Sequence, residues 1–221
     1  MVMGKVRCDS RLVRPGDTFV AVPGVKADGI NFVPAAIAAG AGEIVAEVVR
    51  PESGVPDSIL WRTVPNARVE LASLACNEFG NPSHKLDIFG ITGTNGKTST
   101  TMLLRDILEY NAFKPGFIST NSIEIKPRAL KKFNPTEAVD AKVEENTVTS
   151  GNTTPGPLNL QYYFSEMLRN SCKTAVMEVS SHALDQNRTW GTRFAVKAFT
   201  NLTQDHLDYH CSMAEYYQVK K

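Results

Sequence analysis

The stretch Gly93-Thr94-Asn95-Gly96-Lys97-Thr98-Ser99 decides the fold of the part of the chain that contains it. A short apolar run, residues 86–92, precedes it and is typical of a buried parallel strand. After it, five apolar residues fall on one helical face: Met102, Leu103, Leu104, Ile107 and Leu108. In a strand, glycine turn and helix of this kind, backbone N–H groups converge on an anion, the lysine reaches the outer phosphates, and the threonine hydroxyl meets Mg²⁺. Residues 93–99, here called the phosphate loop, are therefore predicted to bind a nucleotide.

One position departs from the commonest phosphate-loop pattern. That pattern has a glycine five residues before the Gly-Lys pair, and this chain has Ile91 there. Gly93 makes the turn instead, which predicts a different loop geometry. A chance turn before a helix is the alternative, and the flanking patterns argue against it.

Bulk composition excludes several classes of protein. A length of 221 residues with 42% hydrophobic content is sufficient for one large globular domain or two small ones. The 24 Lys and Arg residues nearly balance the 23 Asp and Glu residues, so no overall charge favours nucleic acid or an anionic membrane. We expect a monomer whose partners are small molecules.

Two further absences concern the sequence itself. No apolar run approaches membrane-spanning length and the first residues contain no signal-peptide core, so a cytoplasmic location is expected. The cysteines are scattered without a Cys-x-x-Cys pair, which favours neither a disulfide framework nor a structural zinc site. They are Cys8, Cys76, Cys172 and Cys211.

The element pattern predicts an α/β protein with two domains. Residues 1–82 contain strand patterns at 18–22 and 43–47 and helix patterns at 32–39 and 67–79, ending at the breaker Gly80-Asn81-Pro82-Ser83. Residues 83–221 add a helix at 158–169 and strands at 174–179 and 194–200 to the phosphate-loop unit. This alternation predicts a parallel sheet with helices on both faces.

Two segments of the second domain are less regular. Residues 121–151 are polar and fit no clean period, so a hairpin with an extended surface loop is expected. A parallel sheet that begins near residue 85 usually needs more strands than the remaining residues provide. The chain is therefore interpreted as the front part of a larger enzyme, with an incomplete second domain.

Four polar segments follow predicted strands, at the sheet edge where open α/β proteins bind ligands. They are residues 152–155, 177–182, 186–188 and 201–210. Glu178 ends an apolar strand, where a carboxylate is costly to bury unless it binds a cation or a donor. It is a candidate Mg²⁺ ligand, with a salt bridge as the alternative. His206 could ligate the same ion, or could be a capping or core histidine.

In combination, these motifs resemble the Mur ligase family. The resemblance runs nearly end to end, over the first domain and the early central domain of that family. The motifs that carry it are Asp9-Ser10-Arg11, residues 15–21, Asp28-Gly29, the phosphate loop, and residues 152–155, 178–182 and 205–210.

The resemblance implies an ATP- and Mg²⁺-dependent ligase of peptidoglycan precursor synthesis, from the tripeptide-forming branch of the family. Its substrate would be UDP-N-acetylmuramoyl-L-alanyl-D-glutamate, extended by L-lysine or meso-diaminopimelate. ATP would phosphorylate the terminal carboxylate, and the incoming amine would attack the acyl phosphate. A ligase of the folylpolyglutamate type and a non-catalytic nucleotide-binding module are the competing readings.

The resemblance also implies residue roles. Lys97, Glu178, His206 and Lys220 would be catalytic, with Thr98, Glu178, His206 and Lys220 at the metal. Substrate contacts would come from Cys8, Ser10, Val25, Lys26, Ala27, Asn152, Thr153, Thr154, Ser180, Gln186 and Arg188. A guanidinium such as that of Arg188 can pair bidentately with a carboxylate or pyrophosphate, and a solvated surface arginine is the alternative.

Three positions near residue 221 need separate comment. Lys220 matches a lysine that the family carbamylates to form a metal ligand, a modification that requires a neutral amine. Lys221 is the alternative by register, and an ordinary terminal lysine is the alternative for both. Cys211 stands where the family has glycine, which predicts a strained turn if φ is positive there.

Overall fold

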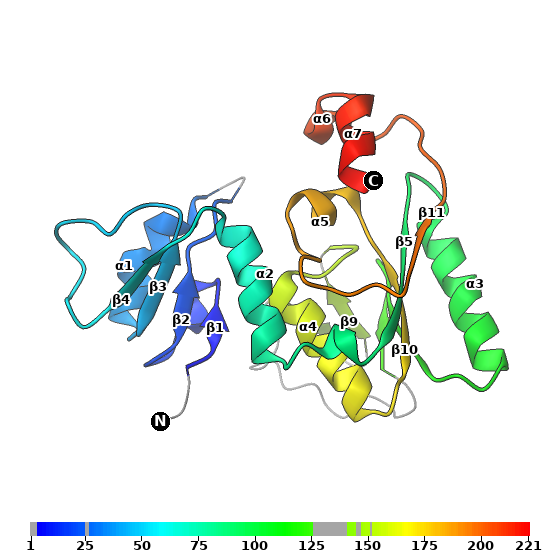
Figure 1. The fold of residues 1–221 in the computed structure, drawn as a ribbon, viewed down its shortest axis with the longest axis horizontal. Helices are drawn as coiled ribbons and strands as arrows, with labels where there is room; N and C mark the ends of the chain where they lie inside the picture. The colour runs from blue at the N-terminus through cyan, green and yellow to red at the C-terminus, as the bar shows by residue number, and fades with distance from the viewer. Residues whose placement is uncertain (1–3, 25–26, 126–140, 145–146, 151) are drawn as a thin grey trace. The chain divides into compact units, whose positions relative to one another are not determined.

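The structure is a computed structural model that describes residues 4–24, 27–125, 141–144, 147–150 and 152–221. The chain divides into two compact units, Met1–Glu78 and Phe79–Lys221. Each unit has its own parallel β-sheet and its own helices (Figure 1). The predicted α/β fold class is confirmed.

The first unit contains a four-stranded sheet in the order β1-β2-β3-β4, with every neighbouring pair parallel. The strands are β1 (Val6–Arg7), β2 (Thr18–Val20), β3 (Glu43–Ala46) and β4 (Leu60–Thr63). The helices are α1 (Val33–Ala38) and α2 (Ala67–Glu78), with 3-10 turns η1 (Ser10–Leu12) and η2 (Gly29–Phe32). Both predicted strands and both predicted helices of this region are present, whereas the short β1 and the half-exposed β4 gave no sequence signal.

Asp17 explains part of the motif at residues 15–21. Its buried carboxylate pairs with Arg7, with 3.0 Å between Nε and Oδ2, and also accepts the backbone N–H groups of Lys5 (2.8 Å) and Arg14 (3.0 Å). A buried charge is tolerated only when it is paired and hydrogen-bonded in this way. Asp17 therefore has a structural role in the first unit.

The second unit contains a five-stranded sheet in the order β11-β5-β10-β6-β7, in which only the β6–β7 pair is antiparallel among the described residues. Its strands are β5 (Asp87–Thr92), β6 (Pro115–Ile118), β7 (Ile123–Glu124), β10 (Thr174–Glu178) and β11 (Val196–Phe199). Its helices are α3 (Lys97–Tyr110), α4 (Pro157–Arg169), α5 (Ser181–Asp185), α6 (Leu207–His210) and α7 (Met213–Lys220), with one 3-10 turn, η3 (Pro82–His84).

Helices cover both faces of this sheet, as the strand–helix alternation predicted (Figure 1). Successive strand residues point to opposite faces. Ile88 and Met177 therefore pack in the larger core with α4, and Ile91 and Val176 pack in a smaller cluster with α3. The strands read as continuous apolar runs because both of their faces are buried.

The apolar face predicted for the helix after the phosphate loop is only partly correct. Leu104 and Leu108 pack against the sheet. Met102, Leu103 and Ile107 are 42%, 64% and 59% exposed. Five apolar residues span a wider arc than one helix can bury against this sheet, so the outer three remain at the surface.

The irregular stretch contains the expected hairpin. Strands β8 (Ala141–Glu144) and β9 (Thr147–Ser150) pair antiparallel, and the remainder of residues 126–151 lies outside the described residues. Across the described part of the chain, no helix is both long and apolar enough to cross a membrane.

Candidate functional site

The phosphate loop joins β5 to α3 through two glycines in the left-handed region. Gly93 has a φ of 141° and Gly96 a φ of 82°. A Cβ at residue 93 would lie 2.0 Å from the Thr200 hydroxyl oxygen, so a glycine is required there for space as well as for φ. Gly96 supplies no side-chain cap to α3, which leaves the first N–H groups of the helix for an anion.

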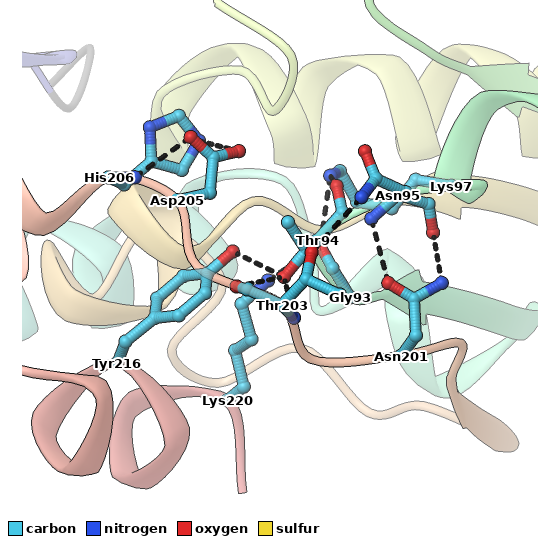
Figure 2. A network of polar contacts seen from close by, with 10 residues as sticks. All are labelled: Gly93, Thr94, Asn95, Lys97, Asn201, Thr203, Asp205, His206, Tyr216 and Lys220. Atoms are coloured by element: carbon cyan, nitrogen blue, oxygen red, sulfur yellow. Dashed lines mark hydrogen bonds and ion pairs between the residues drawn. The ribbon is translucent and has the colours of Figure 1, made fainter.

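The loop is held in place by residues that follow β11 (Figure 2). The Thr94 N–H donates to the Asn201 carbonyl (2.9 Å), and the Asn95 N–H donates to the Asn201 side-chain oxygen (3.1 Å). The Asn95 amide also donates to the Thr203 hydroxyl (3.1 Å). The neighbouring parallel strand therefore preorganises the loop.

Two lysines converge on one carbonyl of this loop. Lys97 donates to the carbonyls of Gly93 (2.9 Å) and Thr94 (2.8 Å), and Lys220 donates to the same Gly93 carbonyl (2.6 Å). Burial lowers the pKa of Lys97 from its usual range. Burial and the charge of Lys97 lower the pKa of Lys220 to about 8. Lys220 therefore loses its proton more readily than a solvated lysine does.

The position of Lys220 excludes the reading as an ordinary terminal lysine. The residue is 7% exposed at the end of α7, and its ammonium nitrogen lies 4.5 Å from the centroid of the Tyr216 ring. Lys221 is exposed. Of the two alternatives left open by register, Lys220 is the one that reaches the phosphate loop.

Glu178 lies at the carboxyl end of β10 and is 1% exposed. Its carboxylate accepts the Thr120 N–H (3.2 Å) and lies 3.4 Å from the Thr120 hydroxyl, which in turn lies 3.1 Å from the Thr153 hydroxyl. Among the described residues its carboxylate is bound by these groups rather than by a basic side chain, so the salt-bridge alternative is not observed.

His206 begins α6 in the left-handed region, with φ 52°. Its ring packs edge-on against His182, with 4.9 Å between centroids, and its Nε2 lies 3.6 Å from a carboxylate oxygen of Asp205. Burial, and then the neighbouring His206, lower the pKa of His182. The exposed His206 is not a core histidine, and it occupies the helix N-cap position without a side-chain capping bond.

A cavity of about 290 Å³ brings many of the predicted residues together. Its lining consists of Lys97, Asn152, Thr153, Ser180, Ser181, His182, Arg188, His206, Tyr216 and Lys220. Lys97, residues 180–182 and His206 follow the carboxyl ends of β5, β10 and β11, where open α/β folds bind ligands. The cavity therefore joins the phosphate loop to the segments at 152–155 and 205–210.

Hydrogen bonds order the part of this cavity around residues 152–154 and 180–188. The Thr154 hydroxyl donates to the Glu178 carbonyl (3.0 Å) and accepts the Ser180 N–H (3.0 Å). Arg188 donates to the Thr154 carbonyl (2.9 Å) and, through Nε and Nη2, to the Gln186 side-chain oxygen (3.1 and 2.7 Å). Arg188 is thus a half-buried organiser of the loop rather than a solvated surface arginine.

Three of the predicted substrate residues that the structure describes belong to the first unit. Cys8 follows β1, and Ser10 begins η1, which Asp9 caps through the Arg11 N–H (3.0 Å). Ala27 is exposed in the loop before Asp28. Val25 and Lys26 lie outside the described residues.

Sequence reasoning missed three residues that the site uses. Thr120 follows β6, so the strand-end rule that found Glu178 could have found it. Thr203 lies within the quoted 201–210 segment but was given no role. Tyr216 is buried beside the loop, and no local sequence pattern marks it.

The residues fit a nucleotide, and they fit Mg²⁺ in part. The glycine cradle and the uncapped helix suit phosphate groups. Thr98 and Glu178 offer the hard oxygen ligands that Mg²⁺ prefers. Within the described ranges, no three His, Cys, Asp or Glu side chains are grouped closely enough to hold a metal.

Comparison with known families identifies this arrangement. The profile of the Mur ligase middle domain matches residues 91–221, and that of the Mur ligase family catalytic domain matches residues 4–69. The chain belongs to the Mur ligase family.

Similar Mur ligases carry a shared name. The chain is 40% identical over 220 residues to a UDP-N-acetylmuramoyl-L-alanyl-D-glutamate–2,6-diaminopimelate ligase of Chlorobaculum tepidum, covering 100% of this chain and 39% of the relative. It is 41% identical to a protein of the same name from Bacillus cereus, covering 97% and 39%. The chain thus spans about two fifths of the length of these relatives.

Solved Mur ligase structures agree on the fold. A structure of a UDP-N-acetylmuramoyl-L-alanyl-D-glutamate–2,6-diaminopimelate ligase aligns with a TM-score of 0.75 at 26% identity, covering 99% of this chain and 40% of that one. A MurF ligase of Thermotoga maritima in complex with ADP aligns with a TM-score of 0.55 at 22% identity, covering 99% and 42%. The second likeness supports the fold alone.

Proposed function

We propose that this chain forms part of an ATP- and Mg²⁺-dependent ligase of peptidoglycan precursor synthesis. The enzyme adds a diamino acid to UDP-N-acetylmuramoyl-L-alanyl-D-glutamate. The observation that carries the proposal is the cavity lined by Lys97, Lys220 and Arg188, in which both lysines bond to the Gly93 carbonyl of the phosphate loop. The names of the similar relatives favour 2,6-diaminopimelate over lysine as the added amino acid.

In this proposal, the phosphate loop and Lys97 hold the ATP phosphates while the substrate carboxylate takes the γ-phosphoryl group. Mg²⁺, when bound, neutralises charge that develops on the transferring phosphoryl group. The diamino acid amine then attacks the acyl phosphate, phosphate leaves, and the amine loses a proton as the amide forms. Arg188 and Gln186 orient the peptide end of the substrate, together with Ser180 and the 152–154 segment.

Lys220 is proposed to carry a carbamate in the active enzyme. The ammonium first loses one proton, and reaction of the resulting neutral amine with CO₂ forms an N–C bond and releases a second, so a cation becomes a carboxylate-like anion. The described site holds Glu178 as its one buried carboxylate near Lys97, so a second anionic oxygen ligand would complete a site for Mg²⁺ with Thr98 and His206.

The first unit is proposed to hold the uridine end of the substrate through Cys8, Ser10 and the loop at residues 25–27. The protein is proposed to work as a monomer in the cytoplasm, where nucleotide-linked precursors and ATP occur together.

The test has two arms on the 221-residue chain. Calorimetric titration with Mg·ADP and with UDP-N-acetylmuramoyl-dipeptide measures binding, and ADP release with 2,6-diaminopimelate or lysine measures turnover. Lys97→Met is expected to weaken Mg·ADP binding at least tenfold, because the lysine reaches the outer phosphates. Lys173→Met, at the opposite end of β10, is the matched control and should bind like the wild type.

Each outcome bears on a different part of the proposal. Binding of both ligands without turnover contradicts the idea that this stretch of chain is catalytic by itself and supports a binding module. Absence of dipeptide binding contradicts the role given to the first unit. Turnover with lysine but not 2,6-diaminopimelate contradicts the proposed amino acid.

A further inference from the structure

Tyr216 is fully buried beside the phosphate loop, and nothing in the proposed chemistry uses it. It lies on α7, one turn before Lys220. Its hydroxyl oxygen lies 3.1 Å from the Thr94 hydroxyl oxygen, and its ring lies beneath the Lys220 ammonium (Figure 2). One side chain therefore touches both the loop and the lysine.

The direction of the hydroxyl contact follows from the other bonds of Thr94. The single Thr94 hydroxyl proton is donated to the Thr203 carbonyl (3.1 Å), and the oxygen accepts the Thr203 N–H (3.0 Å). The Tyr216 hydroxyl must then donate to Thr94. Burial raises the pKa of Tyr216, which keeps the proton on the phenol.

The ring contact has a separate consequence. The Lys220 nitrogen lies 4.5 Å from the ring centroid and 2.6 Å from the Gly93 carbonyl, so the ring face and the carbonyl fix the ammonium from two sides. The Tyr216 ring also packs against His210, at 5.1 Å between centroids. Since His210 is itself buried, Tyr216 has little room to rotate away.

We propose that Tyr216 is a positioning residue: its hydroxyl positions the phosphate loop for the nucleotide through Thr94, and its ring positions the unmodified Lys220 side chain. This inference rests on the proposed function, because it assumes that the loop binds a nucleotide. The two contacts belong to different atoms of one side chain, so two substitutions separate them. Tyr216→Phe removes the hydroxyl and keeps the ring, and Tyr216→Leu removes both.

The first measurement is calorimetric titration of the 221-residue chain with Mg·ADP. Tyr216→Phe is expected to raise Kd about fivefold. Without this buried hydrogen bond the loop is less ordered, so part of the binding free energy is used to order it. Tyr217→Phe is the matched control, since that neighbouring ring is 43% exposed, and its Kd should equal that of the wild type. A Tyr216→Phe variant with unchanged Kd overturns the hydroxyl role.

A double-mutant cycle separates positioning from general packing. Thr94→Val and Tyr216→Phe should not add in their effects on Kd, since both remove the same contact. Full additivity overturns the inference, as does a Tyr216→Phe variant that loses thermal stability while Mg·ADP binding stays unchanged.

The second measurement does not depend on the nucleotide. Acetic anhydride labelling followed by mass spectrometry reports the reactivity of Lys220 in each variant. Lys220 in Tyr216→Leu should react several-fold faster than in the wild type or Tyr216→Phe, because the ring no longer covers it. Equal rates in all three overturn the ring role. Failure of the wild type to bind Mg·ADP contradicts the proposed function, and the labelling result then still decides the placement of Lys220.

Discussion

The phosphate loop and the segment at residues 206–211 both turn the chain through positive φ angles, but they do so with different residues. The loop places glycine at its turns, Gly93 and Gly96. The later segment places His206 at φ 52° and Cys211 at φ 57°. A residue with a Cβ is destabilised by about 1–2 kcal/mol of conformational free energy at positive φ. The second segment is therefore strained, and its surroundings hold it in this conformation. The phosphate loop avoids this strain because its positive-φ residues are glycines.

The largest expected effect comes from replacing a glycine of the phosphate loop. Gly93→Ala should lower the free energy of unfolding by about 3 kcal/mol or more and abolish Mg·ADP binding, because its Cβ would clash with Thr200. Gly96→Ala has no neighbour within 4 Å of the new Cβ, so only the φ penalty of about 1–2 kcal/mol applies. Urea denaturation measures both, and equal losses would contradict the role of space at Gly93.

The second-largest expected effect is a pH dependence of the free energy of unfolding that arises from Lys220. The pKa of Lys220 is about 8 in the folded chain, against 10.5 for the free side chain. Between these pH values the unfolded chain binds more protons, so the free energy of unfolding should rise with pH, by on the order of 2 kcal/mol. Below about pH 8 both states are protonated and the folded state bears the full cost of burying the charge.

Denaturation curves between pH 7 and 10.5 check this dependence. The slope that is lost in Lys220→Met, relative to the wild type, isolates Lys220 from other titrating groups. Lys221→Met, at an exposed position, should keep the full slope. An unchanged slope in Lys220→Met would show that the lysine is not desolvated.

A smaller effect would relax the strained segment. Cys211→Gly should raise the free energy of unfolding by about 0.5–1 kcal/mol, because relief of the φ penalty exceeds the entropy cost of glycine. Cys211→Ala keeps the penalty and should be neutral. Thermal unfolding measures the difference, and a destabilised Cys211→Gly would contradict the presence of strain at residue 211.

The smallest effect on stability is expected for His206→Asn, with His206→Val as its contrast. Asn tolerates the left-handed region, so His206→Asn should change the free energy of unfolding by less than about 0.5 kcal/mol. His206→Val should cost about 1 kcal/mol or more, since a β-branched residue is a true outlier there. Chemical denaturation tests the order of the two variants, and the reverse order would mean that the imidazole contacts, rather than φ, dominate at this position.

The same contrast explains which features the sequence could predict. The phosphate loop was predictable because its determinants are local: an apolar strand, two glycines and a helix within about 25 residues. Glu178 and Thr154 were found by the rule that places ligand groups at strand ends. The match of Cys211 to a family glycine predicted strain there if φ is positive, and φ is 57°.

Other features depend on contacts between distant segments. Tyr216 touches Thr94 across 122 residues, and no spacing in the sequence marks that pair. Five apolar residues of α3 were predicted to share one helical face, and Leu103 and Ile107 are exposed, because periodicity shows which residues share a face but not how much of it the sheet covers. The short strands β1 and β7 have two residues each, too few to form a pattern.

The strand order of the second unit also has a consequence for the synthesis of the chain. β5 lies between β10 and β11, so Ile88 pairs with Ala175 and Phe89 with Val196. The phosphate loop depends on contacts that are even more distant in sequence. The Thr94 hydroxyl bonds to Thr203 and Tyr216, which lie 109 and 122 positions later in the chain. Contacts so far apart are slow to close, and they cannot form before the later residues leave the ribosome. The supports of the phosphate loop are therefore completed only after residues 201–216 have been synthesised.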